Sequence, residues 1–257
     1  MLELQHIHKY YNAGTVNEMC LFDDFNLTVK DHQFVSVVGS NGSGKTSLLN
    51  IICGSIPLDQ GTIRIGNADI TRMPEYKRQR RIGRVYQNPS MGTCPSMTIA
   101  ENMALADNKG KFFNLRPGAN KHRMDFYRES LRSLGLGLED KMDVKVGVLS
   151  GGQRQAMALL MSTMTPIEFL ILDEHTAALD PKTAETIMEL TDRIVKEKEL
   201  TTIMVTHNLR YAVEYGNRLL MMHQGHAIMD KEGKEKDAIQ IDDILTKFNE
   251  ISIECGN

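Results

Sequence analysis

The sequence predicts an α/β fold in which a largely parallel sheet carries an antiparallel β arm and an inserted α-helical subdomain. Three observations support this prediction. An apolar, β-branched run at residues 34–38 leads through a glycine-rich segment into helical spacing. Further short strand-like runs follow at residues 81–85, 168–172 and 201–206. Between residues 89 and 164 the apolar positions recur at helical spacing instead, which indicates a helical insertion.

Composition and charge bound the class of protein. The chain has 257 residues, 41% of them hydrophobic, which suits one large domain with a full core. A net charge of −3 argues against a dedicated nucleic-acid binder, and the one basic run, residues 77–84, is typical of a solvated helix end. The apolar runs are far shorter than the ~20 residues that span a bilayer, and the N-terminus lacks an apolar signal core. We therefore expect a cytoplasmic protein whose four cysteines stay reduced.

The first elements follow from alternation and turn signals. Alternating apolar residues predict strands at residues 2–7 and 21–29. Residues 61–67, with their glycine-asparagine turn, predict a hairpin arm. The helix after the glycine-rich segment is expected to end at Cys53, because Gly54 suits the left-handed position beyond a helix C-terminus.

The glycine-rich segment is interpreted as a nucleotide-phosphate cradle. Its glycines allow a backbone path that turns N–H groups inward, while Lys45 supplies a point charge for the β/γ-phosphates and Thr46 a hydroxyl for Mg²⁺. The helix that starts there adds the field of its N-terminus. The alternative, a glycine-rich turn with an incidental lysine, is disfavoured by the strand before and the helix after. The candidate residues are Gly39, Ser40, Asn41, Gly42, Ser43, Gly44, Lys45, Thr46 and Ser47.

Two further candidates are single residues. An aromatic ring upstream of the cradle can stack on adenine; Tyr11 is the candidate, Tyr10 is the strand-facing alternative, and alternation does not decide between the two rings. Gln87 follows a predicted strand and precedes Pro89, which stops regular structure. A carboxamide at a strand end can reach Mg²⁺ or the attacking water, since parallel strands end at the ligand crevice. The alternative for Gln87 is an ordinary loop glutamine.

A second anion site is predicted where the helical insertion ends. Ser150 is placed as the N-cap of the next helix, and two glycines let an anion approach the first backbone N–H groups. Taken alone, a serine-glycine-glycine turn before a helix is only a cap. The candidate residues are Ser150, Gly151, Gly152 and Gln153.

Acidic and imidazole side chains are expected at the ends of the later strands. Asp173 and Glu174 end a buried strand, and a natural division of roles has Asp173 in the Mg²⁺ shell and Glu174 polarising the attacking water. Asp180 precedes a proline-started helix. His207 ends the strand at residues 201–206, where it can donate to a γ-phosphate, although a lone histidine is more often structural.

The connecting segments and the C-terminus are less specific. Helical spacing continues over residues 99–105 and 124–134, with an exposed connection at residues 107–121. The last expected elements are a hairpin over residues 219–229, a solvated charged link at residues 231–237 and a terminal helix from Ile241 to Phe248.

Taken together, GSNGSGKT, Gln87, LSGGQ, FLILDE, AALD and His207 resemble, in this order and spacing, the ATP-binding subunit of an ABC transporter over nearly the whole chain. The resemblance implies a RecA-like phosphate-loop core at residues 1–88 and 165–230, a helical subdomain with the signature motif at residues 89–164, and a C-terminal segment at residues 231–257. The string LLMSTMTPIEFLILDEHTAALDPKTA also resembles a narrower bacterial group, the ATPases of tryptophan- and tyrosine-type uptake systems.

The resemblance also implies roles for the candidate residues. ATP and Mg²⁺ would be the ligands, with Lys45 and Thr46 on the phosphates and the metal. The catalytic set would be Glu174 as general base, His207 as switch histidine, Lys45, and Gln87 as sensor of the γ-phosphate. The metal set would be Thr46, Gln87 and Asp173, and the nucleotide set would also take in Tyr11, Asp180 and residues 150–153. One departure is His175, where many relatives have proline; we expect a slightly looser turn there.

The partners follow from the two anion sites. Because one nucleotide has a single γ-phosphate, we expect a head-to-tail homodimer that encloses ATP between two copies. The resemblance adds integral membrane permease subunits, an extracytoplasmic solute-binding protein, no nucleic acid, and a peripheral location on the inner face of the membrane. The alternative is a soluble ABC-type ATPase acting on nucleic acid or ribosomes. A phosphate-loop kinase or GTPase would leave LSGGQ and His207 unexplained.

Overall fold

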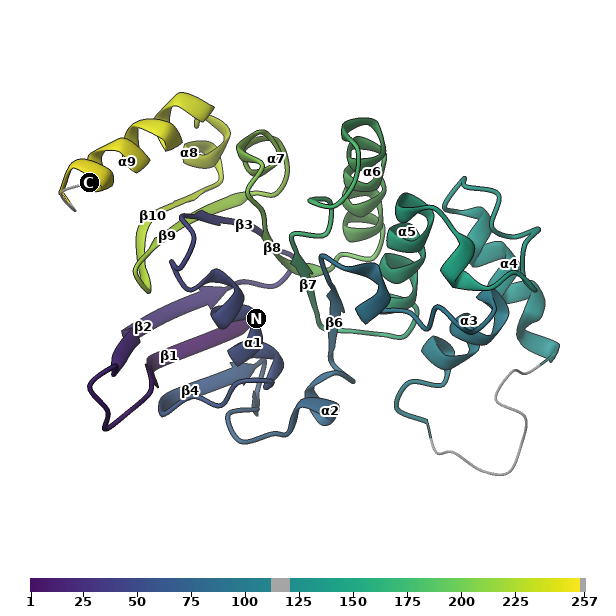
Figure 1. The fold of residues 1–257 in the computed structure, drawn as a ribbon, viewed down its shortest axis with the longest axis horizontal. Helices are drawn as coiled ribbons and strands as arrows, with labels where there is room; N and C mark the ends of the chain where they lie inside the picture. Colours follow the sequence, from purple (N-terminus) through teal and green to yellow (C-terminus); the bar gives the residue numbers. More distant parts are fainter. Residues whose placement is uncertain (112–120, 255–257) are drawn as a thin grey trace. The chain divides into compact units, whose positions relative to one another are not determined.

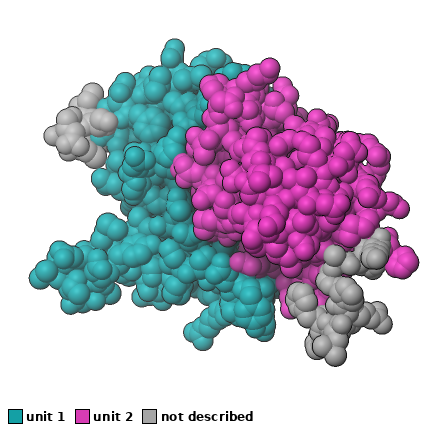
Figure 2. All heavy atoms as spheres, turned by 45° about the vertical axis from the view of Figure 1, so that its right-hand side comes forward, with its two compact units in different colours: residues 1–78, 199–257 teal, residues 79–198 magenta. Residues whose placement is uncertain are grey.

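The computed structural model describes residues 1–111 and 121–254, and these form two compact units. Figure 2 colours the first unit, residues 1–78 and 199–257, teal and the second, residues 79–198, magenta. The second unit includes strands and a long helix in addition to the helical insertion. Its boundaries therefore differ from the predicted division into a core and a helical subdomain, which stays a prediction.

The first unit contains the predicted antiparallel arm. Its strands are β1 (Leu2–Tyr11), β2 (Met19–Val29), β4 (Gln60–Ile65) and β5 (Ala68–Asp69), in the sheet order β2-β1-β4-β5. Figure 1 shows β2, β1 and β4 side by side. The predicted alternation is confirmed, because Leu2, Leu4 and Ile7 are all buried. Residues Ile65 and Ala68 pair across the predicted hairpin turn.

A second sheet of the first unit carries the glycine-rich segment. β3 (Phe34–Gly39) pairs in parallel with β8 (Thr201–Val205) and β9 (Arg218–His223), and β9 forms an antiparallel hairpin with β10 (His226–Glu232). Every residue of β3 is buried, as expected for a strand covered on both faces.

Helices cover the strands of the first unit. They are α1 (Lys45–Cys53), α2 (Glu75–Arg78), α7 (Leu209–Glu214), α8 (Lys234–Asp237) and α9 (Ile241–Glu254). The predicted end of α1 is confirmed, since Gly54 takes φ 85° and its N–H bonds to the helix carbonyls. Ile244 of α9 is fully buried in a core cluster with Val38 and Ala212.

Two predictions about solvated charged segments are wrong at particular residues, while other residues of both segments are exposed as predicted. Within the basic run, the Arg78 guanidinium is buried and donates to the carbonyls of Ile51 and Ile52, so it caps the end of α1. Within the charged link, Lys236 belongs to α8 and is buried, and its ammonium donates to the Val213 carbonyl. In both cases a long cationic side chain donates hydrogen bonds to carbonyl groups near the end of a helix. The spacing of residues along the sequence does not reveal these contacts.

The second unit consists of a parallel strand pair and helices. β6 (Ile82–Val85) pairs in parallel with β7 (Phe169–Asp173). The helices are η1 (Pro89–Met91), α3 (Ile99–Asp107), η2 (Lys121–Arg123), α4 (Met124–Arg132), η3 (Val146–Val148), α5 (Gly151–Ser162) and α6 (Pro181–Glu197). The predicted insertion between β6 and β7 is therefore helical. Most of the connection predicted at residues 107–121 lies outside the described residues.

Candidate functional site

The predicted phosphate cradle lies between β3 and α1. A Cβ atom on Gly39 would come 2.3 Å from the Met222 carbonyl oxygen of β9, so only glycine fits at this strand end. Gly42 and Gly44 have φ values of 78° and 100°, which turn the chain into the helix. The strand, the glycine loop and the helix N-terminus thus have the order that a backbone phosphate site requires.

Lys45 is held inside the loop that precedes it. The side chain is buried, and its ammonium donates to the carbonyls of Gly39 at 2.8 Å and Ser40 at 2.9 Å. Thr46, in the same first turn of α1, is exposed. The lysine charge therefore lies at the loop, and the threonine hydroxyl is open to a ligand.

The structure favours Tyr11 over Tyr10 as the ring beside the cradle. The Tyr11 hydroxyl donates to Ser47 Oγ of α1 at 3.3 Å, and the Lys9 ammonium lies 5.6 Å from its ring centroid. The Tyr10 hydroxyl has a different partner, Cys20. A side-chain hydrogen bond with Cys20 raises the pKa of Tyr10. Tyr11 is thus the tyrosine whose side chain reaches the glycine-rich loop and its helix.

The turn of the β9–β10 hairpin supports the loop, and sequence reasoning missed this contact. The Gly225 N–H donates to the Ser43 carbonyl at 3.0 Å, and His223 Nδ1 lies 3.5 Å from Ser40 Oγ. A Cβ atom on Gly225 would overlap the Leu21 carbonyl oxygen at 1.6 Å. The only sequence signal was the glutamine-glycine turn itself, which does not say what packs on it.

His207 lies at the same sheet edge as the cradle. It follows β8, and the backbone of Thr206 bonds to Val37 of the neighbouring β3 at 3.2 Å. Both segments therefore leave the carboxyl ends of adjacent parallel strands, the edge where parallel sheets bind ligands. The exposed imidazole is placed between β8 and α7, whose N-cap is Asn208.

The second unit brings Gln87, Asp173 and Glu174 to one edge of the β6–β7 pair. Val85 and Leu172 are partners in that pair, so Asp173 ends β7, while Gln87 and Glu174 follow the carboxyl ends of the two strands. Asp173 is not left unpaired, because Arg84 Nη2 donates to its Oδ2 at 2.6 Å. The Arg84 guanidinium also lies 4.6 Å from the ring centroid of Tyr86.

Arg84 was missed because its sequence neighbours suggested a solvated basic run. On β6 it is aligned with Ile171, and Asp173 lies two residues further along β7 on the same face. With Arg84 and Asp173 side chains only 10% and 13% exposed, the pair offsets much of the cost of burying an acid at the strand end.

Glu174 begins a turn of unusual geometry. Its φ is 48°, a left-handed conformation that costs a non-glycine residue of order 1–3 kcal/mol and that clusters at functional sites. The next residue, His175, is 2% exposed, and its Nε2 lies 3.1 Å from Thr191 Oγ1 of α6. The expectation of a looser turn in the absence of proline did not take into account this hydrogen bond between His175 and Thr191.

Burial of His175 makes the stability of the second unit sensitive to acid. Burial lowers the pKa of His175 from 6.5 to about 4. Between pH 6.5 and pH 4, His175 is therefore protonated in the unfolded chain and neutral in the folded chain. Stability is full above pH 6.5 and falls as the pH drops. We expect a loss of about 2 kcal/mol in the free energy of unfolding between pH 7 and pH 5, measured by urea titration of the nucleotide-free protein.

The matched control is His175→Gln, which keeps an N–H donor but does not titrate. Its unfolding free energy is expected to vary less with pH over the same range. If both proteins lost stability equally, the acid sensitivity would belong to other groups.

The second predicted anion site has the expected cap. Ser150 Oγ accepts from the Gln153 N–H, and Gln153 Oε1 accepts from the Ser150 N–H, which is a capping box at the start of α5. Gly152 has a role that the sequence did not suggest: a Cβ atom there would lie 2.3 Å from Thr183 Cγ2 of α6. The second glycine therefore lets Thr183 pack closely against α5, while the helix N-terminus keeps the electrostatics that favour an anion.

A pocket in the second unit connects two of the predicted motifs. Gln87 and Gly151 line it together with Arg154 and Leu179. Behind it, the fully buried Gln155 of α5 donates from Nε2 to the carbonyl of Tyr86 at 3.0 Å. Sequence reasoning missed Gln155, although it lies only two residues after Gln153 of the LSGGQ motif. It joins α5 to the strand end that presents Gln87.

Asp180 is first of all a helix cap in this structure. Its carboxylate accepts from the Thr183 N–H at 3.1 Å at the start of α6, and the hydrogen bonds of Thr183 lower the pKa of Asp180. The side chain is exposed, so the cap and a contact with a ligand are compatible.

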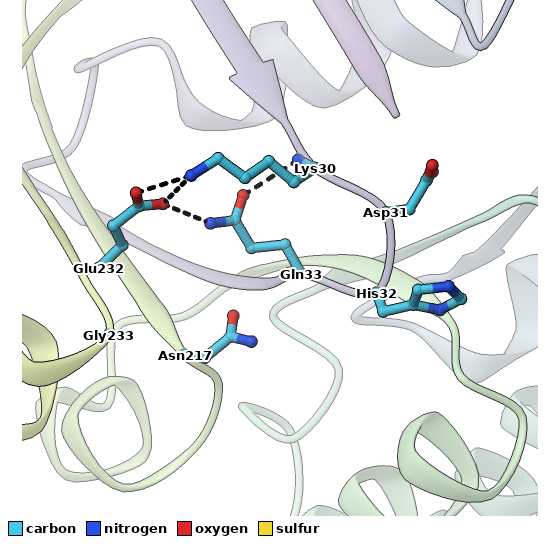
Figure 3. A pocket seen from close by; sticks show the side chains of 7 residues that line it. All are labelled: Lys30, Asp31, His32, Gln33, Asn217, Glu232 and Gly233. Atoms are coloured by element: carbon cyan, nitrogen blue, oxygen red, sulfur yellow. Dashed lines mark hydrogen bonds and ion pairs between the residues drawn. The ribbon is translucent and has the colours of Figure 1, made fainter.

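A polar pocket of the first unit has a structural explanation (Figure 3). Its lining includes Lys30, Gln33 and Asn217, at the amino ends of β3 and β9 and thus at the strand ends opposite the cradle. Glu232 accepts from Lys30 at 2.7 Å and from Gln33 at 2.8 Å. The charges of Lys30 and Glu232 neutralise each other, so the pocket has no evident binding role.

The donors present fit a nucleotide with Mg²⁺. Among the described residues, no group of three or more His, Cys, Asp or Glu side chains could hold a metal. Mg²⁺ commonly binds through one or two protein oxygens together with phosphates and water, so a dedicated cage is not needed. Within the first unit, the exposed Thr46 hydroxyl lies in the first turn after a loop that only glycine can form, which suits a phosphate-bound metal.

The comparisons with known proteins agree with this chemistry. A family model described as ABC transporter matches residues 22–177. The chain is 46% identical over 248 residues to a tyrosine transport ATP-binding protein of Clostridioides difficile, covering 96% of this chain and 98% of that one. It is 32% identical over 235 residues to the spermidine/putrescine import ATP-binding protein PotA of Haemophilus influenzae, covering 91% of this chain. It spans only 59% of that longer relative.

Solved structures give the same result. The dimeric post-hydrolysis structure of the ATP-binding cassette MJ0796 with ADP and Pi matches with a TM-score of 0.76 and 28% identity, over 90% of this chain and 98% of that chain. The ADP conformation of MJ1267, a cassette of an ABC transporter, matches with a TM-score of 0.80 and 25% identity, over 100% and 99%. In the part of the chain that the structure describes, no helix has the length and apolarity to cross a membrane.

Proposed function

The chain belongs to the ABC transporter family as an ATP-binding and ATP-hydrolysing transport subunit, and from this premise we propose that it powers the import of an amino acid, with tyrosine as the first candidate. The observation that carries the proposal is the 46% identity to a tyrosine transport ATP-binding protein over almost the full length of both chains. Import is supported by the names of several more distant relatives.

The first unit is proposed to bind the nucleotide. Lys45 and the loop N–H groups would hold the β- and γ-phosphates, Thr46 would hold Mg²⁺, and Tyr11 would stack on the adenine. Support comes from the loop geometry, from the contact of Tyr11 with the cradle helix and from the position of His207 at the same sheet edge. The Mg²⁺ would neutralise charge on the phosphates as the γ-phosphoryl group leaves.

The second unit is proposed to supply the hydrolytic groups. Glu174 would accept a proton from the attacking water, Asp173 would join the Mg²⁺ shell, and Gln87 would report whether the γ-phosphate is present. The arrangement of all three at the end of one strand pair supports this division. His207 of the first unit would donate to the γ-phosphate.

The two anion sites are proposed to act in different copies of the chain. Each ATP would lie on the cradle of one copy and be covered by residues 150–153 of the other, so that ATP holds a head-to-tail homodimer closed and hydrolysis releases it. The likeness to a dimeric cassette with ADP and Pi supports a dimer. A membrane-embedded permease would receive this movement at the inner membrane surface, and a solute-binding protein would deliver the amino acid from outside.

The proposal is tested by reconstitution. The chain would be co-expressed with a candidate multi-span permease, and the complex placed in liposomes that enclose ATP, with a candidate solute-binding protein outside. Uptake of labelled tyrosine that requires both ATP and the solute-binding protein is the expected result. Uptake of other solutes in preference to tyrosine would exclude tyrosine as the substrate. Stimulation of the ATPase by DNA or ribosomes, instead of by the membrane protein, would contradict the transport role.

A further inference from the structure

The turn between β7 and α6 is anchored at its second residue. His175 follows Glu174 directly, its side chain is almost wholly buried, and its Nε2 lies 3.1 Å from Thr191 Oγ1 in the middle of α6. We propose that His175 and Thr191 form a positioning pair that holds the backbone of Glu174 in its working conformation. The inference rests on the proposed role of Glu174 as the general base.

The direction of the hydrogen bond between the pair follows from the partners of Thr191. Its hydroxyl has a single proton, and that hydroxyl lies 2.7 Å from the Ile187 carbonyl, an acceptor only. Thr191 Oγ1 must therefore accept from His175, so the imidazole carries its proton on Nε2. A buried neutral ring with a defined tautomer is a directional link, unlike a side chain held by apolar packing alone.

The link acts on Glu174 through the backbone. Glu174 has a φ of 48°, and its carbonyl accepts from the Ala177 N–H at 2.9 Å. The carbonyl end of Glu174 is thus held twice, by this local hydrogen bond and by the buried anchor of the next residue, His175. Without the anchor, Glu174 can relax toward ordinary backbone angles, and the carboxylate at the end of its side chain moves with it.

The same anchor connects Glu174 to the helix that follows. Thr191 lies in α6, and the N-cap of α6 is Asp180, so both ends of the turn at residues 174–180 are attached to one helix. The turn therefore has little freedom to move independently of α6. A proline at position 175 would restrict its own φ but could not make this connection.

The test compares nearly isosteric variants at the two positions. Thr191→Val removes the acceptor and Thr191→Ser keeps it; His175→Leu removes the donor and His175→Gln keeps an N–H at the Nε2 position. Thr163→Val is the matched control, because Thr163 is another buried threonine of the second unit whose hydroxyl bonds to helix carbonyls. For each full-length variant, kcat, KM for ATP, the dissociation constant of ATP and the melting temperature are measured.

We expect Thr191→Val and His175→Leu to lower kcat by about ten- to a hundredfold, with KM and the ATP dissociation constant within about twofold of the wild type. Thr191→Ser and His175→Gln restore most of kcat. A purely structural pair would instead change kcat only in proportion to the loss of melting temperature, as in Thr163→Val.

Two outcomes overturn the inference. One is a wild-type kcat in Thr191→Val; the other is a loss of kcat that Thr163→Val matches at equal loss of stability. Glu174→Gln, measured in parallel, separates this failure from failure of the underlying assignment. If Glu174→Gln abolishes turnover while Thr191→Val does not, only the positioning pair is wrong. If Glu174→Gln keeps turnover, the role of Glu174 itself is wrong.

Discussion

Replacing Glu174 by glutamine is expected to lower kcat for ATP hydrolysis by about 10²-fold or more while ATP still binds. The amide has the size of the carboxylate but cannot accept the proton of the attacking water. In the proposed head-to-tail dimer, unhydrolysed ATP persists between the two copies, so we expect the variant to accumulate as a dimer. Steady-state ATPase assays give kcat, and light scattering with and without ATP gives the oligomeric state.

The control for this prediction is Glu189→Gln, which makes the same change at an exposed position of α6 and leaves turnover unchanged. Two results would contradict the model separately. Turnover near the wild-type rate would remove Glu174 from the role of base. A monomer at saturating ATP would remove the head-to-tail dimer, whatever the rate.

The second large effect is expected for Lys45→Ala. The ammonium is the positive charge nearest to the loop, and a hydrogen bond from a charged donor to a phosphate contributes about 1.5–3 kcal/mol. The ATP dissociation constant should therefore rise by roughly ten- to a hundredfold. The structure adds a second cause, because Lys45 also bonds to the carbonyls of Gly39 and Ser40 and so shapes the loop. Titration calorimetry measures the affinity directly.

Lys234→Ala, which removes an exposed lysine at the start of α8, is the comparison for Lys45→Ala. Its ATP affinity should equal that of the wild type. An unchanged dissociation constant in Lys45→Ala would refute the phosphate cradle. A change in melting temperature without a change in affinity would leave Lys45 with a structural role only.

Much of the fold could be predicted because its signals are local. The alternation of Leu2, Leu4 and Ile7 places a strand, and Gly54 ends a helix through its own backbone freedom. Ser150 and Asp180 are N-caps within three residues of the N–H groups that they accept from. Each of these features depends on residues close together in the chain.

The errors came from contacts between residues far apart in the chain. Arg78 and Lys236 look solvated in a charged run, yet each reaches helix carbonyls more than twenty residues away. Arg84 reaches Asp173 across 89 positions, and Gln155 reaches Tyr86 across 69. A long polar side chain has the same sequence pattern whether water or a distant backbone group satisfies it.

The motifs alone identify the chemistry of this protein, because a phosphate cradle needs glycines, a lysine and a hydroxyl at fixed spacing along one strand–loop–helix segment. They do not say how Glu174, the proposed general base, is held. That depends on a buried imidazole meeting the hydroxyl of Thr191, sixteen residues away on another element, and on a left-handed backbone at Glu174. Such a contact forms only when β7 and α6 pack together, and therefore no spacing along the chain predicts it.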